Sequence, residues 1–220
     1  NLVSWSKWGV GQIRHWYHQA AKYQETIMVD PDVYKPGVKP RGNRFLTLGR
    51  MSKEKGNLPA AILCREMKWP LDIAGGRGSE KIGGEDLSLY EKDVMSYCDG
   101  RQIVYHGEVS EEAKIELLQS CKALIYATDH VEITSHKVQE ALLCGAPVLV
   151  PDSGGLPEIV THGVDGFLCR TEQDYVDYLG QLDKLDPAKT RANLAEKYSP
   201  AKTASDYVTL FEQVRDGLRW

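Results

Sequence analysis

The feature that most constrains the fold of this chain is a regular alternation, from Arg44 onward, of short apolar segments with longer segments of helical length. Short apolar strands separated by helices form parallel sheets that are covered on both faces. The sequence therefore predicts an α/β fold, a single doubly wound domain with a parallel sheet of about six strands. The expected strands are 45–49, 71–76, 103–107, 123–127, 148–150 and 166–169, and the expected helices between them are 57–68, 84–97, 110–120 and one that starts within 134–137.

The ends of the expected strands carry the residues of interest. Ligands of doubly wound domains bind beyond the carboxyl ends of the strands. Here, those ends are followed by glycine-bearing turns or polar loops at Gly49, 75–76, Gly107, 129–135 and 153–155. This pattern is typical of a Rossmann-like nucleotide-binding domain. Segment 75–78 lacks the glycine spacing of a dinucleotide fingerprint, and segment 49–56 lacks the Lys-Ser/Thr pair of a P-loop.

The two ends of the chain differ from this pattern. Ser6 can cap a helix that continues to about Tyr23 and carries several aromatic side chains. A short strand is expected at 26–29, and the proline- and glycine-rich segment 30–42 is typical of a linker. Two interpretations of the aromatic helix remain open: it packs on its own domain, or it belongs to a neighbouring lobe. A last helix is expected at 198–218.

Composition excludes several classes of function. The 27 basic and 31 acidic residues give a formal net charge of -4, which does not support a whole-domain basic surface for nucleic acid. No apolar run approaches the roughly 20 residues of a membrane span. The five cysteines are scattered and form no Cys-x-x-Cys pair, which indicates reduced thiols in a cytoplasmic protein. Because the chain opens on Asn1 without a signal-type segment, we expect that a preceding segment has been removed.

Two segments can bind an anion at the carboxyl edge of the sheet. In the first, Arg50 and Lys55 flank a helix start after Gly49, and arginine grips phosphate oxygens bidentately while lysine acts as a point charge. The alternative for this segment is a solvated basic turn. In the second, residues 134–137 present hydroxyls and free backbone N–H groups at another helix start. A diphosphate between the two segments would be neutralised from both sides.

Two glutamates complete this constellation. Glu132 lies in the loop before the second helix start, and Glu140 lies inside that helix, with seven residues between them. An ionised Glu140 could accept hydrogen bonds from a ribose diol. Either glutamate alone would more often be a solvated charge. Their spacing, together with the basic turn and the glycine turns, favours a binding site.

The ordered set of motifs resembles a known family. The motifs are 49–50 with 55–56, Ile73-Ala-Gly-Gly76, His106-Gly-Glu-Val109, Glu132 with Glu140, Ala141-Leu-Leu-Cys-Gly-Ala-Pro-Val148, Ser153-Gly-Gly-Leu-Pro-Glu158 and Gly163-Val-Asp-Gly166. Together they resemble the nucleotide-binding carboxyl-terminal lobe of the retaining family-four glycosyltransferases, which have the GT-B fold. The resemblance runs from about Arg44 to the end of the chain.

The resemblance implies a role for each matched residue. Arg50 and Lys55 would bind the donor diphosphate and stabilise it as it leaves, and Glu132 would contact the sugar near the reacting carbon. Glu140 would hold the ribose of a UDP-sugar or GDP-sugar. The reaction would be front-face attack with retention, and no metal or other cofactor is implied. The remaining donor-binding residues would be Gly49, Gly76, Val109, Lys114, Thr134, Ser135, His136 and Lys137.

The resemblance also implies a domain organisation. Residues 1–41 would be the last helix of an amino-terminal lobe and the interlobe linker, residues 42–197 the Rossmann-like donor-binding lobe, and residues 198–220 a helix that returns toward the other lobe. The chain would then be a fragment of a hexosyltransferase and inactive alone. Its sugar or lipid-linked acceptor, and any peripheral membrane association, would belong to the missing lobe.

One motif departs from the family. Where relatives have Glu-Pro-Phe-Gly, this chain has Glu132-Ile-Thr-Ser135, so a glycine that lets phosphate approach closely is replaced by serine. Two alternatives to a transferase lobe therefore stay open. One is a non-catalytic GT-B-like module that docks partners. The other is half of a sugar-nucleotide epimerase, which the pattern from Glu132 to Gly145 disfavours.

Overall fold

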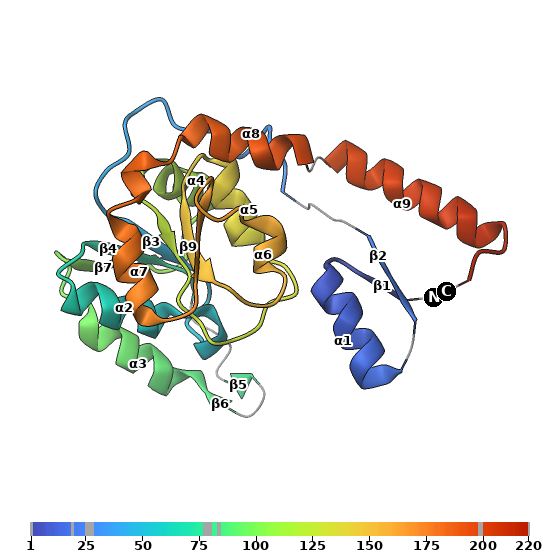
Figure 1. Ribbon diagram of the computed structural model, residues 1–220. Coiled ribbons are helices and arrows are strands. Elements are labelled where there is room, and N and C mark those ends of the chain that lie inside the picture. The colour runs from blue at the N-terminus through green and yellow to red at the C-terminus, as the bar shows by residue number, and fades with distance from the viewer. Residues whose placement is uncertain are drawn as a thin grey trace.

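The computed structural model describes residues 2–18, 20–24, 29–76, 81–82, 85–197 and 200–219. Its main sheet is parallel and six-stranded, which confirms the predicted α/β class (Figure 1). The strand order is β10-β9-β8-β3-β4-β7, so the chain runs outward from β3 to β7 and then returns to β8 on the other side of β3. The strands are β3 Phe45–Leu48, β4 Leu71–Ala74, β7 Ile103–Tyr105, β8 Leu124–Ile125, β9 Val148–Pro151 and β10 Gly166–Cys169.

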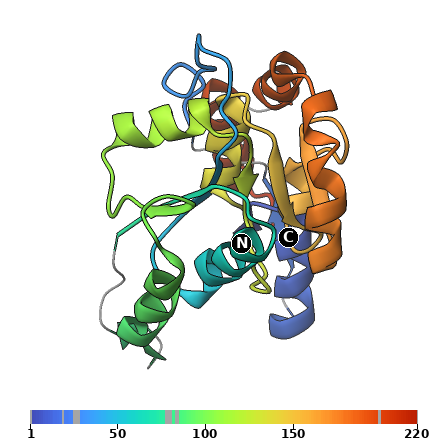
Figure 2. The same ribbon diagram turned by 90° about the vertical axis from the view of Figure 1, so that its left-hand side faces the viewer.

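Helices cover both faces of the sheet (Figure 2). Successive side chains of β3 alternate between the two faces: Phe45 packs in one core cluster, and Leu46 and Leu48 pack in the other. Side chains of α2 Asn57–Glu66, α3 Leu87–Tyr97 and α7 Glu172–Leu179 fill the first cluster. The second is filled from α4 Glu111–Ser120, α5 His136–Leu143, α6 Leu156–Ile159 and α8 Pro187–Lys197. Ser110 caps α4 as predicted, since its hydroxyl accepts a hydrogen bond from the Ala113 N–H.

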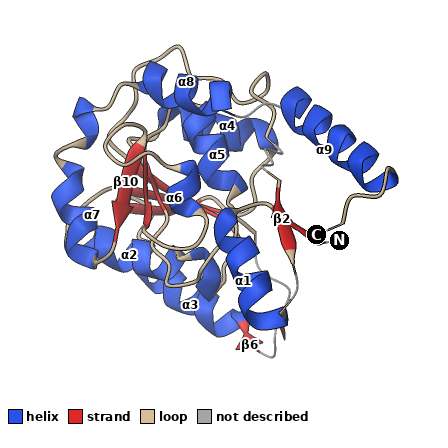
Figure 3. Cartoon of the chain, turned by 45° about the vertical axis from the view of Figure 1, so that its right-hand side comes forward, coloured by secondary structure: helices blue, strands red, loops and turns tan. Residues whose placement is uncertain are grey.

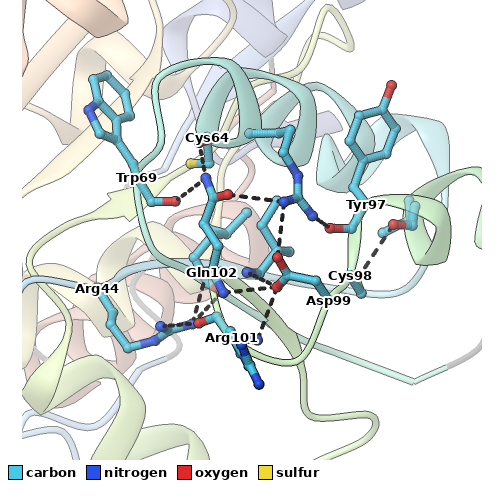
Figure 4. A network of polar contacts seen from close by, with 12 residues as sticks. Arg44, Cys64, Trp69, Tyr97, Cys98, Asp99, Arg101 and Gln102 are labelled. Atoms are coloured by element: carbon cyan, nitrogen blue, oxygen red, sulfur yellow. Dashed lines mark hydrogen bonds and ion pairs between the residues drawn. The ribbon is translucent and has the colours of Figure 1, made fainter.

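A polar network fixes the amino-terminal edge of the sheet, opposite the predicted ligand edge (Figure 4). One carboxylate oxygen of Asp99 accepts hydrogen bonds from the backbone N–H groups of Arg101, Gln102 and Ile103 at 3.0, 2.8 and 3.1 Å. The other oxygen lies 2.9 Å from Nη1 of Arg65 on α2. Backbone hydrogen bonds, and then Arg65, hold the pKa of Asp99 below its ordinary value. The network therefore ties α2 to the start of β7 without using any residue of the predicted site.

The amino-terminal segment differs from the prediction. Helix α1 Lys7–Tyr17 ends earlier than expected because His18 adopts a left-handed conformation, with φ 51°. The chain then returns as β2 Ala21–Tyr23, which pairs in parallel with β1 Leu2–Ser4, so the sequence reading missed a small sheet. Of the strand expected at 26–29, residues 26–28 lie outside the described residues.

The segment before α3 also differs from the prediction. The expected helix from residue 84 begins only at Leu87, after β5 Lys81–Ile82 pairs antiparallel with β6 Glu85–Asp86. The last helix, α9 Pro200–Arg215, lies on the side of the small β1–β2 sheet (Figure 1, Figure 3), where Lys22 Nζ lies 3.4 Å from Gln213 Oε1. Within the described part of the chain, no helix combines the length and apolar character needed to cross a bilayer. The five cysteines are free thiols, four of them buried.

Glu158 joins the amino-terminal segment to the main domain. Its two carboxylate oxygens accept hydrogen bonds from the backbone N–H groups of Lys7 and Trp8, both at 2.9 Å. These N–H groups belong to the first turn of α1, whose positive dipole end favours a carboxylate. The contact places the loop before α1, which contains Trp5, beside the carboxyl edge of the main sheet.

Candidate functional site

The turns after β3 and β4 meet at the carboxyl edge of the sheet. A Cβ atom on Gly75, where φ is +152°, would lie 2.0 Å from the carbonyl oxygen of Gly49, so the two turns are in direct contact. Gly49 N–H donates to Ala74 O at 3.0 Å, and Met51 N–H donates to Gly76 O at 3.2 Å. Two predicted site residues, Gly49 and Gly76, thus fix the turn that leads to Lys55.

A cavity of about 320 Å³, here called the Lys55 cavity, opens next to this turn. Seven of its eight lining residues are site residues predicted from the sequence. The eighth is Trp5, which was not predicted. The lining residues are Trp5, Gly49, Lys55, Glu132, Thr134, Ser135, His136 and Lys137.

Lys55 and Glu132 form an ion pair inside this cavity. Lys55 Nζ lies 2.8 Å from Glu132 Oε1, and the side chains are 26% and 17% exposed. The hydroxyl of Tyr126 also donates to Glu132 Oε1. Partial burial acts to raise the pKa of Glu132, but the hydrogen bonds from Lys55 and Tyr126 outweigh it, and the pKa lies below its ordinary value. Glu132 is therefore an ionised acceptor.

Lys137 lies beneath this ion pair. Its ammonium is 3.0 Å from Leu48 O, 3.4 Å from Lys55 O and 3.2 Å from the centre of the Tyr126 ring. The two carbonyls belong to the end of β3 and to the turn that carries Lys55, so Lys137 holds both against α5. Burial, and then the nearby charge of Lys55, lower the pKa of Lys137 well below its ordinary value, although Glu132 acts in the opposite direction.

Replacing Lys137 with methionine is expected to weaken the rise of stability with pH. The folded pKa lies below the unfolded value of about 10.4, so the unfolded chain binds the proton more tightly. The contribution to stability is complete above the unfolded pKa and is lost as pH falls toward the folded pKa, by about 1.4 kcal/mol per pKa unit. Urea titrations at about pH 7 and about pH 10 would measure the change. Lys92→Met, on the exposed face of α3, is the control and should show the same rise of stability with pH as the wild type. A rise in Lys137→Met equal to that of the wild type would contradict the prediction.

The amino end of α5 faces the same cavity. Ser135 is the N-cap residue, yet its hydroxyl makes no capping hydrogen bond. Since the first N–H groups of a helix have no intrahelical partner, this end can receive an anion. Ser135 has an extended backbone, with φ −143°. The serine that replaces the family's glycine therefore needs no left-handed conformation.

A second cavity, of about 260 Å³ and here called the Glu140 cavity, lies on the other side of His136. Lys114 Nζ is 2.8 Å from Glu140 Oε1. Glu140, which is predicted to hold the ribose, is therefore paired with another predicted donor-binding residue. His136 lines both cavities, which makes them neighbours along α5. The lining residues are Val29, Asp30, Val33, Tyr34, Glu111, Lys114, His136 and Glu140.

Three predicted site residues line neither cavity, and one of them, Gly76, belongs to the turn after β4 described above. Val109 lines a separate cavity of about 620 Å³ between the 37–40 segment and α4, together with His106 and Leu117. Arg50 is half exposed, and its Nη2 lies 3.4 Å from Glu54 Oε1. Arg50 thus belongs to the turn that carries Lys55 without lining the Lys55 cavity, and Val109 lines a different cavity from Lys114 and Glu140.

Sequence reasoning missed three aromatic residues of the site. Trp5 and Tyr34 come from the segments before and after α1, and only the tertiary fold brings them to the cavities. Tyr126 follows β8, and the sequence predicts only that it belongs to an apolar strand. Its position three residues before the polar loop, on the same sheet face as Leu124, was the available signal.

The fold and these cavities define a class of protein: a Rossmann-like lobe of the GT-B glycosyltransferases. The fold of sucrose-phosphate synthase from Thermosynechococcus elongatus matches 98% of this chain and 58% of that structure, with a TM-score of 0.81 at 16% identity. Anabaena HepE in complex with UDP and glucose matches 98% of this chain and 62% of that structure, with a TM-score of 0.69 at 17% identity. Residues 31–199 match the model of the glycosyl transferases group 1, and the chain belongs to this family.

A curated relative covers most of the chain. The human alpha-1,3/1,6-mannosyltransferase ALG2 is 28% identical over an alignment that includes 82% of this chain and 53% of ALG2. The D-inositol 3-phosphate glycosyltransferase of Mycolicibacterium smegmatis is 24% identical over 87% of this chain and 47% of the relative. The chain therefore spans about half the length of these curated relatives.

Proposed function

We propose that this chain is the donor-binding lobe of a retaining hexosyltransferase, and that it binds a UDP-sugar or a GDP-sugar across the two cavities. The observation that carries the proposal is the pairing of Lys55 with Glu132 in front of the uncapped amino end of α5. This arrangement offers a cation and a helix dipole to a diphosphate, and a carboxylate to the hydroxyls of a sugar.

The two cavities would divide the donor between them. The diphosphate and sugar would occupy the Lys55 cavity, where Lys55 would exchange its bond to Glu132 for a phosphate oxygen. The nucleoside would extend past His136 into the Glu140 cavity, and Glu140 would accept hydrogen bonds from the ribose diol. HepE, which has this fold, was solved in complex with UDP, which agrees with such a ligand.

The chemistry of transfer would depend on stabilising the leaving diphosphate. Lys55, Arg50 and the α5 dipole would balance the charge that develops as the bond from the anomeric carbon to phosphate breaks. Glu132 would orient the sugar so that the acceptor attacks from the face that the phosphate leaves. The proposed roles use residues of the chain and no metal.

The rest of the proposed enzyme would lie outside this chain. Residues 1–41 would be the end of an amino-terminal lobe with its linker, and residues 198–220 a helix that returns to that lobe. A sugar or lipid-linked acceptor would bind there, so transfer would require the whole protein. We further propose a cytoplasmic location, in agreement with the free thiols.

Calorimetric titration of UDP and GDP into the chain tests the proposal. Lys55→Ala is expected to weaken binding of the preferred nucleotide by about 10- to 100-fold, because a charge-assisted hydrogen bond contributes about 1.5–3 kcal/mol. Arg50→Ala should weaken binding less, since its side chain is half exposed. Lys53→Ala is the matched control, because Lys53 is on the same short 3-10 helix, Lys53–Lys55, but does not line the cavity. Absence of binding by the wild type, or equal affinity in Lys55→Ala, would refute the proposal.

A further inference from the structure

Tyr34 joins the segment after α1 to the Glu140 cavity. Its side chain is 5% exposed, and its hydroxyl lies 2.9 Å from Glu111 Oε1 and 3.1 Å from Glu140 Oε1. These two acceptors are on different helices, α4 and α5. The phenol therefore sits where the 29–36 segment, α4 and α5 meet.

The backbone around Tyr34 is held by Arg191 on α8. Arg191 Nη1 donates to Tyr34 O at 2.6 Å and to Leu143 O at 2.8 Å, and its Nη2 donates to Pro31 O at 2.7 Å. Leu143 is the last residue of α5. One guanidinium thus fixes the 31–34 turn to the helix that carries Glu140, and the position of the phenol relative to Glu140 is determined by main-chain contacts.

The hydrogen bonds that Glu140 accepts from side chains converge on one of its two carboxylate oxygens. A phenol has one O–H, so Tyr34 donates to one carboxylate at a time. Lys114 Nζ, 2.8 Å from Glu140 Oε1 and 5.1 Å from the centre of the Tyr34 ring, is the second donor. Within the described residues, both donors use Oε1 and none reaches Oε2. Burial, and then Glu140, raise the pKa of Tyr34, so the phenol stays a donor throughout the neutral range.

We propose that Tyr34 is a positioning residue for nucleoside binding: its hydroxyl holds the Glu140 carboxylate in the orientation that receives the ribose diol. The inference rests on the proposed function, because it needs a nucleoside in the Glu140 cavity. Tyr34 acts through Glu140 and does not itself touch the diphosphate. Removing its hydroxyl should therefore affect recognition of the ribose hydroxyls and spare recognition of the phosphates.

The test compares two ligands on two proteins. The ligands are the diphosphate nucleotide that the wild type prefers, UDP or GDP, and its 2′,3′-dideoxy analogue. Tyr34→Phe is expected to weaken binding of the ribonucleotide by about 3- to 15-fold, the usual range for one hydrogen bond. The same substitution should change the affinity for the dideoxy analogue by less than about twofold, since that ligand offers no diol to Glu140. Tyr17→Phe, at an exposed position, is the control for loss of a tyrosine hydroxyl.

Glu111→Gln provides a second variant. It weakens the competing acceptor, so the phenol donates more to Glu140, and ribonucleotide affinity should increase by up to about threefold. An equal loss for both ligands in Tyr34→Phe, or no loss for either, would overturn the role of Tyr34 alone. Absence of any nucleotide binding by the wild type would overturn the proposed function and this inference with it.

Discussion

Replacing Gly75 with alanine is expected to lower the free energy of unfolding by about 3–5 kcal/mol and to abolish nucleotide binding. Two costs add. Gly75 has φ +152°, a conformation that side-chain-bearing residues rarely adopt, and the new Cβ would lie 2.0 Å from Gly49 O and 2.5 Å from Gly49 C. The contacted atoms belong to the backbone, so the steric clash can be relieved only if the ends of β3 and β4 separate. That separation moves the turn that carries Arg50 and Lys55.

Gly100→Ala is the matched control for this prediction. Gly100 also has a positive φ, +71°, but an added Cβ would meet no atom within 4 Å. The free energy of unfolding of Gly100→Ala is expected to fall by only about 1–2 kcal/mol, the cost of the left-handed conformation, and its nucleotide affinity should be unchanged. Urea denaturation and calorimetry measure both effects. Equal destabilisation of the two variants would contradict the contact between the Gly49 and Gly75 turns.

Replacing Glu158 with alanine is expected to release α1 from the main domain. The variant leaves the Lys7 and Trp8 N–H groups without their carboxylate and removes a negative charge from the positive end of the helix dipole. Because the contact is partly exposed, the loss should be about 1–3 kcal/mol of local stability. Amide hydrogen exchange in α1 should therefore become about 5- to 100-fold faster, while exchange in β3 and β4 stays unchanged.

Glu158→Gln separates the charge from the hydrogen bonds. Glutamine keeps one acceptor oxygen, so exchange in α1 should fall between those of the wild type and Glu158→Ala. Trp5, which lines the Lys55 cavity, provides a second measurement, because its fluorescence should change as the segment is released. Unchanged α1 exchange in Glu158→Ala would show that other contacts hold the segment.

The main sheet could be predicted from sequence because its signal is local. Segments such as Phe45–Leu48 and Val148–Pro151 are buried at every position, and Thr47 is their one polar residue, as expected for strands covered on both faces; glycine turns mark their ends. The small β1–β2 sheet carries no such signal. Its strands have three residues each, and the early end of α1 depends on a left-handed His18, a conformation that the aromatic pattern of the helix does not encode.

The parts of the site whose residues lie close together in the sequence, or at the ends of neighbouring strands, could be predicted. Contacts between residues far apart in the sequence could not. Residues 132–140 lie in one loop and helix, and the parallel strands bring Gly49 and Lys55 to the same edge. Tyr34, Trp5 and Glu158 act over long sequence separations, so no spacing rule could assign their partners. Val109 follows β7 in sequence, but the fold places it at a cavity between α4 and the 37–40 segment, which is not the cavity that Glu140 lines.

The bond between Glu158 and α1 also affects how the chain is made. Lys7 and its partner are 151 residues apart, and at about 5–20 residues per second a ribosome needs roughly 8–30 s to synthesise that interval. An eleven-residue helix is marginal by itself in water. During this interval α1, with its tryptophans, would lack its carboxylate cap, so it would be open to chaperones that bind nascent apolar segments.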